Sequence, residues 1–203
     1  MNNPLAPLDR IPQLYPLSSV QREIWFDHFL FPDTPLYNVG CHCQIYGELD
    51  LQLFRQAITL LIKENDALRM VLTERNNTPF QSFPDMEDVN ITLVDCSIER
   101  ETQQYALRHI WNIHNQPFRI LEEPLFRQTL YKISELRYVW SYVYHHIAID
   151  GRAINLVAHR VAAHYNALLN GCPLPFRPEI SYRNFLRHDA SLPDPDRLEA
   201  HRP

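Results

Sequence analysis

The spacing of apolar residues predicts two amphipathic helices most clearly. After Gly151, apolar side chains recur at the i, i+3, i+4, i+7 spacing of one helix face, and Gly171 is a typical stop signal. In the first quarter of the chain, Asp50 is a predicted N-cap for another such helix. The two stripes are Ile154, Val157, Ala158, Val161, Tyr165 and Leu168, and Phe54, Ala57, Ile58, Leu61 and Ile62.

Two more helices are predicted from their first residues. Ser18 and Gln21 fit a capping box, in which two side chains satisfy free amides at a helix start. That helix carries Ile24, Trp25, Phe29 and Leu30, and Pro32 ends it. Ser97 is a predicted cap for a helix that runs to about His114. We expect Trp25, Trp111 and Trp140 to belong to the core.

The remaining regular segments favour β-strands. Residues 39–47 and 91–95 are β-prone, and residues 69–74 and 79–83 flank a turn at Asn76-Asn77. A hairpin is predicted from Phe126–Ile133 and Tyr138–His145. Because helices and strands alternate while one pair forms a hairpin, the expected class is α/β or α+β. We expect a two-layer sandwich of a mixed sheet with helices packed on it.

Composition narrows the function. The chain has 203 residues, 45% of them hydrophobic, with a net charge of -5 and no basic stripe, so nucleic acid is not an expected partner. No apolar run approaches the roughly 20 residues that span a bilayer. The start, Met1-Asn2-Asn3-Pro4, lacks the pattern of a secretory signal. Together with four cysteines that form no disulfide framework, these features indicate a reduced, cytoplasmic protein without a membrane partner.

The densest candidate chemistry is the segment from His145 to Gly151, which reads His-His-Ile-Ala-Ile-Asp-Gly. Histidine exchanges protons near neutral pH, and neighbouring strand residues point to opposite faces. We therefore expect one of His145 and His146 to be buried and the other to face outward. Asp150 has three open interpretations: a bond to an imidazole, a pair with an arginine, or a helix N-cap. Under the structural interpretation, both histidines are simply half-buried strand-end residues.

Other chemistries have weaker support. The segment Cys41-His42-Cys43 places two sulfurs on one strand face, which is still only two metal ligands. His109 with His114, and His159 with His164, are spaced by five residues rather than the four that suit one helix face. With four glycines and no G-x-S-x-G segment, neither a phosphate loop nor a serine hydrolase is indicated. We expect no metal site.

Several segments together resemble condensation domains of nonribosomal peptide synthetases. His145-His146 with Asp150-Gly151 resembles the H-H-x-x-x-D-G motif of that family. The matches run from about Leu14 to about Asp189. The other matching segments are Leu17–Trp25 (S-x-A-Q-x-R-x-W), Glu64–Arg69 (R-H-E-x-L-R), Pro117–Arg119 with Pro124–Arg127 (P-F-D…P-L-x-R) and Tyr182–Phe185 (Y-x-D-F).

The resemblance implies a fold and a reaction. Such domains resemble chloramphenicol acetyltransferase, with two lobes in a V and a tunnel between them. Peptidyl or acyl carrier proteins bring thioester substrates on phosphopantetheine arms, which are tethers rather than bound cofactors. An acceptor amine attacks the donor thioester and an amide forms.

The resemblance also assigns roles to residues. His146 would lie in the tunnel as a general base, or would orient the amine and stabilise the tetrahedral intermediate. His145 would support it, Asp150 would be structural in an ion pair with an arginine, and Gly151 would leave room at the turn. Support for the tunnel would come from Arg69, Gln21 and Arg22.

The chain also departs from the family pattern. Glu64-Asn65-Asp66 replaces Arg-His-Glu, while Leu68-Arg69 is kept. Such variants resemble synthetases of the starter or siderophore type, so we expect an acyl or aryl donor. Because the chain begins at Met1 just ahead of the first motif, we expect the donor to arrive on a separate carrier protein or as a free acyl thioester.

The later motifs of the family have no counterpart here. We therefore expect a proline-rich leader at residues 1–13, the N-terminal lobe at 14–172 and a connector at 173–203 toward a missing C-terminal lobe. We expect negligible activity from this lobe alone, and self-association through its exposed face. The alternatives are a non-catalytic module that docks a carrier protein or the other lobe, and a free-standing chloramphenicol acetyltransferase-like acyltransferase. A third is a metal hydrolase.

Overall fold

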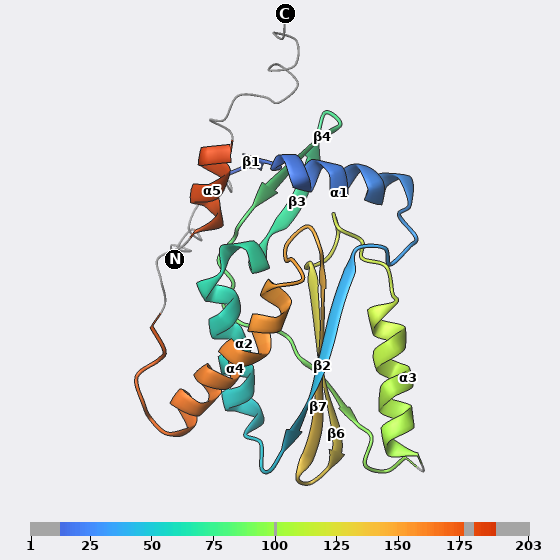
Figure 1. Cartoon of the computed structure of the whole chain (residues 1–203), viewed down its shortest axis with the longest axis vertical. Helices are drawn as coiled ribbons and strands as arrows, with labels where there is room; N and C mark the ends of the chain where they lie inside the picture. Colours follow the sequence, from blue (N-terminus) through green and yellow to red (C-terminus); the bar gives the residue numbers. More distant parts are fainter. Residues whose placement is uncertain (1–12, 100, 177–180, 190–203) are drawn as a thin grey trace, which may run out of the picture.

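A four-stranded mixed sheet forms the centre of the computed structural model, which describes residues 13–99, 101–176 and 181–189 (Figure 1). The strand order is β2-β7-β6-β5. β5 runs parallel to β6, and the other neighbours are antiparallel. The strands are β2 (Asn38–Tyr46), β5 (Thr92–Asp95), β6 (Phe126–Ser134) and β7 (Arg137–His145).

Helices pack on both faces of this sheet. Figure 1 shows α2 (Leu51–Glu64) and α4 (Ala153–Leu169) on one side and α3 (Thr102–His114) on the other. Successive strand residues face opposite sides, so Trp140 packs with α2 and α4 while Val139 packs with α3. The expected mixed α/β class is confirmed, and the second helical face adds a layer to the expected two-layer sandwich.

A second, three-stranded sheet lies beside the first. Its order is β1-β4-β3, from β1 (Tyr15–Pro16), β3 (Val71–Arg75) and β4 (Thr78–Ser82). The predicted turn at Asn76-Asn77 is confirmed, and both asparagines have positive φ, as a two-residue hairpin turn requires. Helix α1 (Ser19–Leu30), the 3-10 helix η1 (Asp66–Arg69) and α5 (Tyr182–Asp189) complete the fold.

The predicted helix starts at Ser18 and Asp50 are confirmed. The Ser18 hydroxyl accepts from the amide of Gln21, whose side-chain carbonyl accepts from the Ser18 amide in return. The Asp50 carboxylate accepts from the amides of Gln52 and Leu53. Both caps are local patterns of three or four residues, which is why the sequence shows them.

Other helix expectations were wrong. Ser97 caps no helix, because its amide and hydroxyl both donate to the Asp95 carboxylate and the chain turns there. The third helix begins instead at Thr102. Trp111 is 69% exposed on that helix and is not a core residue. Phe29 is also largely exposed, so α1 buries less of its apolar surface than its sequence suggests.

The expected domain boundaries are only partly visible. Most of the leader (residues 1–12) and much of the connector (177–180 and 190–203) lie outside the described residues. Within the connector, the Arg160 guanidinium donates to the carbonyls of Pro175 and Phe176, which holds this segment against α4. Across the part of the chain that is described, no helix is long and apolar enough to cross a membrane.

Candidate functional site

The two histidines of the motif divide between the interior and the surface. β7 ends at His145, which is 1% exposed, and His146 is exposed in the turn that follows. This agrees with the expectation from strand alternation. Of the two, only His146 can meet a substrate without rearrangement of the core.

His145 lies among aromatic rings. Its imidazole packs edge-on against His28 of α1 and Phe118, at centroid distances of 5.3 and 5.9 Å, and is tilted against Tyr37 at 6.0 Å. Its Nδ1 accepts from the Ile147 amide at 3.3 Å. Burial, together with the neighbouring His28 and His146, lowers the pKa of His145 to about 3. His145 is therefore neutral at physiological pH and fixes the turn.

Asp150 shapes the start of α4. Its Oδ1 accepts from the amides of Arg152 and Ala153 at 3.0 and 2.7 Å, as an N-cap does. Ion pairs between described residues do not include Asp150, so the pair with an arginine implied by the resemblance is not seen here. A Cβ built on Gly151 would meet no atom within 4 Å, so nothing in the described chain requires glycine at this position.

Gln21 connects α1 to the motif turn. It is 3% exposed, and its Nε2 donates to the Ile147 carbonyl at 3.1 Å. Gln21 also forms a reciprocal amide pair with Gln81, which is fully buried on β4 and donates to the Pro16 carbonyl. Sequence reasoning missed Gln81, because nothing in a short strand marks a residue whose partner is 60 positions away.

Arg22 and Arg69 each hold a nearby chain segment. The exposed Arg22 donates to the Leu17 carbonyl at 3.1 Å, at the start of α1. The buried Arg69 donates to the carbonyls of Phe83 and Pro84 at 2.9 and 3.0 Å, and pairs with the Asp85 carboxylate. Arg69 thereby fixes the chain where β4 ends.

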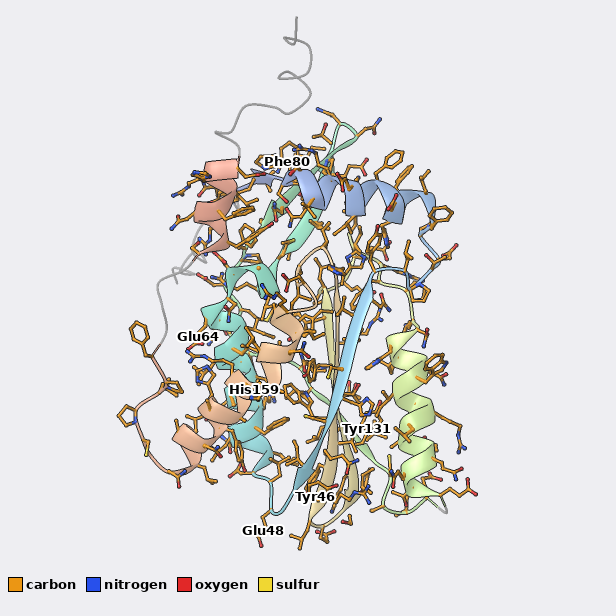
Figure 2. All side chains as sticks on the ribbon, in the orientation of Figure 1. Tyr46, Glu48, Glu64, Phe80, Tyr131 and His159 are labelled. Atoms are coloured by element: carbon orange, nitrogen blue, oxygen red, sulfur yellow. The ribbon has the colours of Figure 1, made fainter. Side chains whose placement is uncertain are left out.

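The Glu64–Arg69 segment, in which Glu64 stands where the family has arginine, contacts α4. Glu64 accepts from Arg160 and contacts Nε2 of the fully buried His164, each at 3.0 Å. Figure 2 shows Glu64 at the end of α2 beside α4. The Glu64 carboxylate therefore forms an ion pair with Arg160 of the same chain.

Asp66, in the same segment, caps α5. Its carboxylate accepts from the Ser181 hydroxyl at 2.6 Å and from the amides of Tyr182 and Arg183 at 2.8 and 3.4 Å. Burial alone would raise the pKa of Asp66, but these bonds and the Arg183 guanidinium lower it. Two of the segments that match the family are therefore joined by one carboxylate.

Arg127 organises the loop that covers His145. Its guanidinium donates to the Gln116 and Pro117 carbonyls and to the Glu123 carboxylate, at 2.7 to 2.8 Å. It also lies 3.9 Å from the centroid of the Phe118 ring. Because Phe118 packs on His145, the P-L-x-R segment supports the buried side of the motif.

An open recess begins at the motif turn. It has a volume of about 500 Å³ and lies between the end of α2, η1, the start of α4 and α5. Its lining is mainly apolar, and Glu64 and Arg160 also line it. We call it the motif recess; its apolar walls include Leu68, Ile149, Leu156, Val157, Tyr182 and Phe185.

Cysteines and metal ligands do not form a second site among the described residues. No three side chains of His, Cys, Asp or Glu in residues 13–99, 101–176 and 181–189 gather closely enough to hold a metal ion. Burial, with Cys41 beside it, raises the pKa of Cys43 to about 11. Cys43 is therefore a protonated thiol at neutral pH, which is a poor nucleophile.

A family model and curated relatives match most of the chain. The model for the condensation domain matches residues 11–202. A dimodular nonribosomal peptide synthase of Bacillus subtilis is 32% identical over 188 residues, or 93% of this chain and 8% of that protein. An isonitrile lipopeptide synthase of Streptomyces coeruleorubidus is 31% identical over 160 residues, covering 78% of this chain and 11% of its own length.

Solved structures give the same result. The starter condensation domain of rhizomide synthetase RzmA superposes with a TM-score of 0.82 at 30% identity, covering 88% of this chain and 43% of that one. A mutant of the same domain in complex with C8-CoA matches equally well, with 88% and 41% covered. The first condensation domain of the calcium-dependent antibiotic synthetase shares the fold, with a TM-score of 0.76 at 22% identity. This chain thus spans less than half of these solved chains.

Proposed function

The chain belongs to the condensation-domain family, and from this we propose that it supplies the His146 wall of a site that forms amide bonds. The acceptor amine on one carrier protein attacks the thioester carbonyl of the donor on another. A C–N bond forms, the C–S bond breaks, and the amine proton leaves while the donor's phosphopantetheine departs as a thiol. The observation that carries the proposal is His146, exposed in a turn whose buried side is fixed by His145.

His146 has two roles open to it, and substitution separates them. As a general base it accepts the amine proton, which contributes about 10²- to 10⁴-fold in comparable enzymes. As an orienting group it only donates or accepts a hydrogen bond. We expect His146→Ala and His146→Gln to lose about 100-fold or more in kcat/KM. If His146→Gln instead keeps nearly full activity, the orienting role holds, because glutamine forms hydrogen bonds without accepting the proton.

We also propose that the donor is an acyl or aryl group rather than a peptide. Three observations support this: the Glu64–Arg69 segment, the likeness to a starter domain, and the apolar motif recess beside Ile149. One such neighbour is a mutant of the rhizomide starter domain in complex with C8-CoA. The test compares octanoyl, aryl and dipeptidyl pantetheine thioesters as donors. A strict requirement for the peptidyl donor would contradict the proposal.

The chain alone should be inactive. A proximity-driven acyl transfer depends on positioning both substrates and excluding water, which one wall of a tunnel does not do. The full chain is therefore assayed alone, and again with the remaining segment of the rhizomide starter domain supplied in trans or fused. We expect amide product only in the second assay, with loss in His146→Ala. Robust product from the chain alone would contradict this expectation.

The same assay tests the alternatives. Carrier-protein binding without His146-dependent product in any combination would favour the docking module. Product from an oligomer of this chain alone would favour a free-standing acyltransferase. The expected partners are carrier proteins with phosphopantetheine arms and the second lobe, and no cofactor is proposed to bind directly.

A further inference from the structure

The orientation of His146 needs a structural cause that its own hydrogen bonds do not supply. Among the described residues, no hydrogen bond reaches either nitrogen of the His146 ring, and the side chain is exposed. A free histidine side chain in a turn samples several rotamers. A group that works on a substrate must instead be held near one direction, because a misplacement of about 1 Å can cost about 100-fold in rate.

Tyr37 contacts His146 in two ways. The Tyr37 carbonyl accepts from the His146 amide at 2.8 Å, which pins the backbone of the turn to the chain before β2. The Tyr37 ring lies edge-on to the His146 ring, with 6.4 Å between centroids and 89° between planes. Because aromatic rings attract each other in this edge-to-face arrangement, the contact favours one direction of the His146 ring. The same ring is 6.0 Å from His145, so Tyr37 contacts both histidines of the motif.

Tyr37 is itself held at its far end. Its hydroxyl donates to the Asp27 carboxylate of α1 at 2.6 Å. That bond raises the pKa of Tyr37, so the phenol remains a donor through neutral pH. The next residue, Asn38, donates to the carbonyls of His114 and Gln116 and anchors the start of β2. The ring is thus fixed at its hydroxyl and at its backbone.

We propose that Tyr37, braced by Asp27, is a positioning residue that fixes the direction of the His146 imidazole. For catalysis the inference rests on the proposed function, but the orientation itself is a property of this chain. Asp27 and Tyr37 would act only through His146 and touch no substrate. Removing the hydroxyl bond should change the mobility of the His146 ring and the turnover, while the Tyr37 ring can still pack on His145.

The orientation is tested by NMR on the full chain labelled with ¹⁵N and ¹³C histidine. His146→Gln assigns the resonances, and three-bond couplings report the χ1 rotamer of His146. We expect one rotamer in the wild type, rotamer averaging in Tyr37→Leu, and partial averaging in Tyr37→Phe and Asp27→Ala, which keep the ring but lose the hydroxyl bond. Because these two variants keep the tyrosine-sized ring, they remain informative if Tyr37→Leu does not fold.

Tyr46 provides the matched control. It lies at the opposite end of β2, 72% exposed and far from α1 in Figure 2. Tyr46→Phe and Tyr46→Leu should leave the His146 couplings unchanged. An unchanged His146 rotamer in folded Tyr37→Phe, Asp27→Ala and Tyr37→Leu would overturn the proposal.

Turnover is measured in the two-part assay described above. We expect kcat to fall about tenfold in Tyr37→Leu with KM little changed, since substrate binding does not need the ring. Averaging of the rotamer with full kcat would overturn the catalytic part of the inference. If the wild type makes no amide in any combination while Tyr37→Leu still frees the ring, the positioning holds and the proposed function fails.

Discussion

His145 and His146 are neighbours in sequence but belong to different regions of the molecule. Around His145 the rings of His28, Tyr37 and Phe118 leave 1% of the residue exposed. Around His146 there is solvent, one backbone bond and one ring edge. The difference teaches that a single strand can divide a motif between a group that maintains the fold and a group that is free to act.

The largest expected effect on stability comes from substituting the two histidines one at a time. His145→Ala removes a buried ring and should lower the free energy of unfolding by about 3 kcal/mol. His146→Ala, in the exposed position, should change it by less than about 0.5 kcal/mol. Urea unfolding followed by circular dichroism measures both. Equal losses in the two variants would show that the exposed histidine is also part of the core.

The next largest effect on stability should come from Gln21, whose side chain holds the motif turn from its buried side. Gln21→Leu leaves the Gln81 amide and the Ile147 carbonyl without their partner, which should cost about 2 kcal/mol of unfolding free energy. Gln104→Leu, on the exposed side of α3, is the matched control and should be nearly neutral. If both substitutions have the same effect, the amide pair contributes nothing specific to the motif turn.

The pH dependence sharpens the comparison further. The pKa of His145 is about 3 in the folded chain against an ordinary 6.5, so the unfolded chain takes up the proton first. Stability from this group is complete above about pH 6.5 and falls as pH drops toward 3, by about 1.4 kcal/mol per pH unit.

A non-titrating variant isolates this contribution. Other groups with lowered pKa values, such as His28, His114 and Asp66, act in both proteins. In His145→Gln the slope of unfolding free energy between pH 6 and 4 should therefore be smaller by the amount attributed to His145. Chemical denaturation at several pH values measures it. Identical slopes in the two proteins would show that His145 takes up its proton at an ordinary pH.

The smallest effect concerns the end of the motif. Asp150→Ala removes the cap of α4 and should cost about 1 kcal/mol, while Asp150→Ser should keep most of the stability. Thermal unfolding at low and high salt measures both. A loss above 3 kcal/mol that shrinks in high salt would instead indicate a buried ion pair.

Some of this site follows from local sequence patterns. The caps at Ser18 and Asp50 depend on residues a few positions apart, and the division between His145 and His146 follows from strand alternation. The family segments mark the same positions. These features are readable because each is fixed by neighbours in the chain.

Other features depend on contacts that no local pattern reports. Gln81 and Tyr37 look ordinary in sequence, yet each meets a partner on another element. Trp111 was expected in the core because of its residue type, but its helix turns it to solvent. Ser97 donates to the Asp95 carboxylate in a turn instead of capping a helix. The cap pattern does not take such competing bonds between neighbouring polar groups into account.

The bond between Asp66 and Ser181 has a consequence for how the chain assembles. The two residues are 115 positions apart, so at ribosomal rates of 5–20 residues per second the carboxylate is made roughly 6 to 23 s before its partner. The eight residues of α5 are too few for a stable isolated helix. During synthesis α5 should therefore dock after the elements that precede it, onto a carboxylate that the earlier part of the chain has already placed.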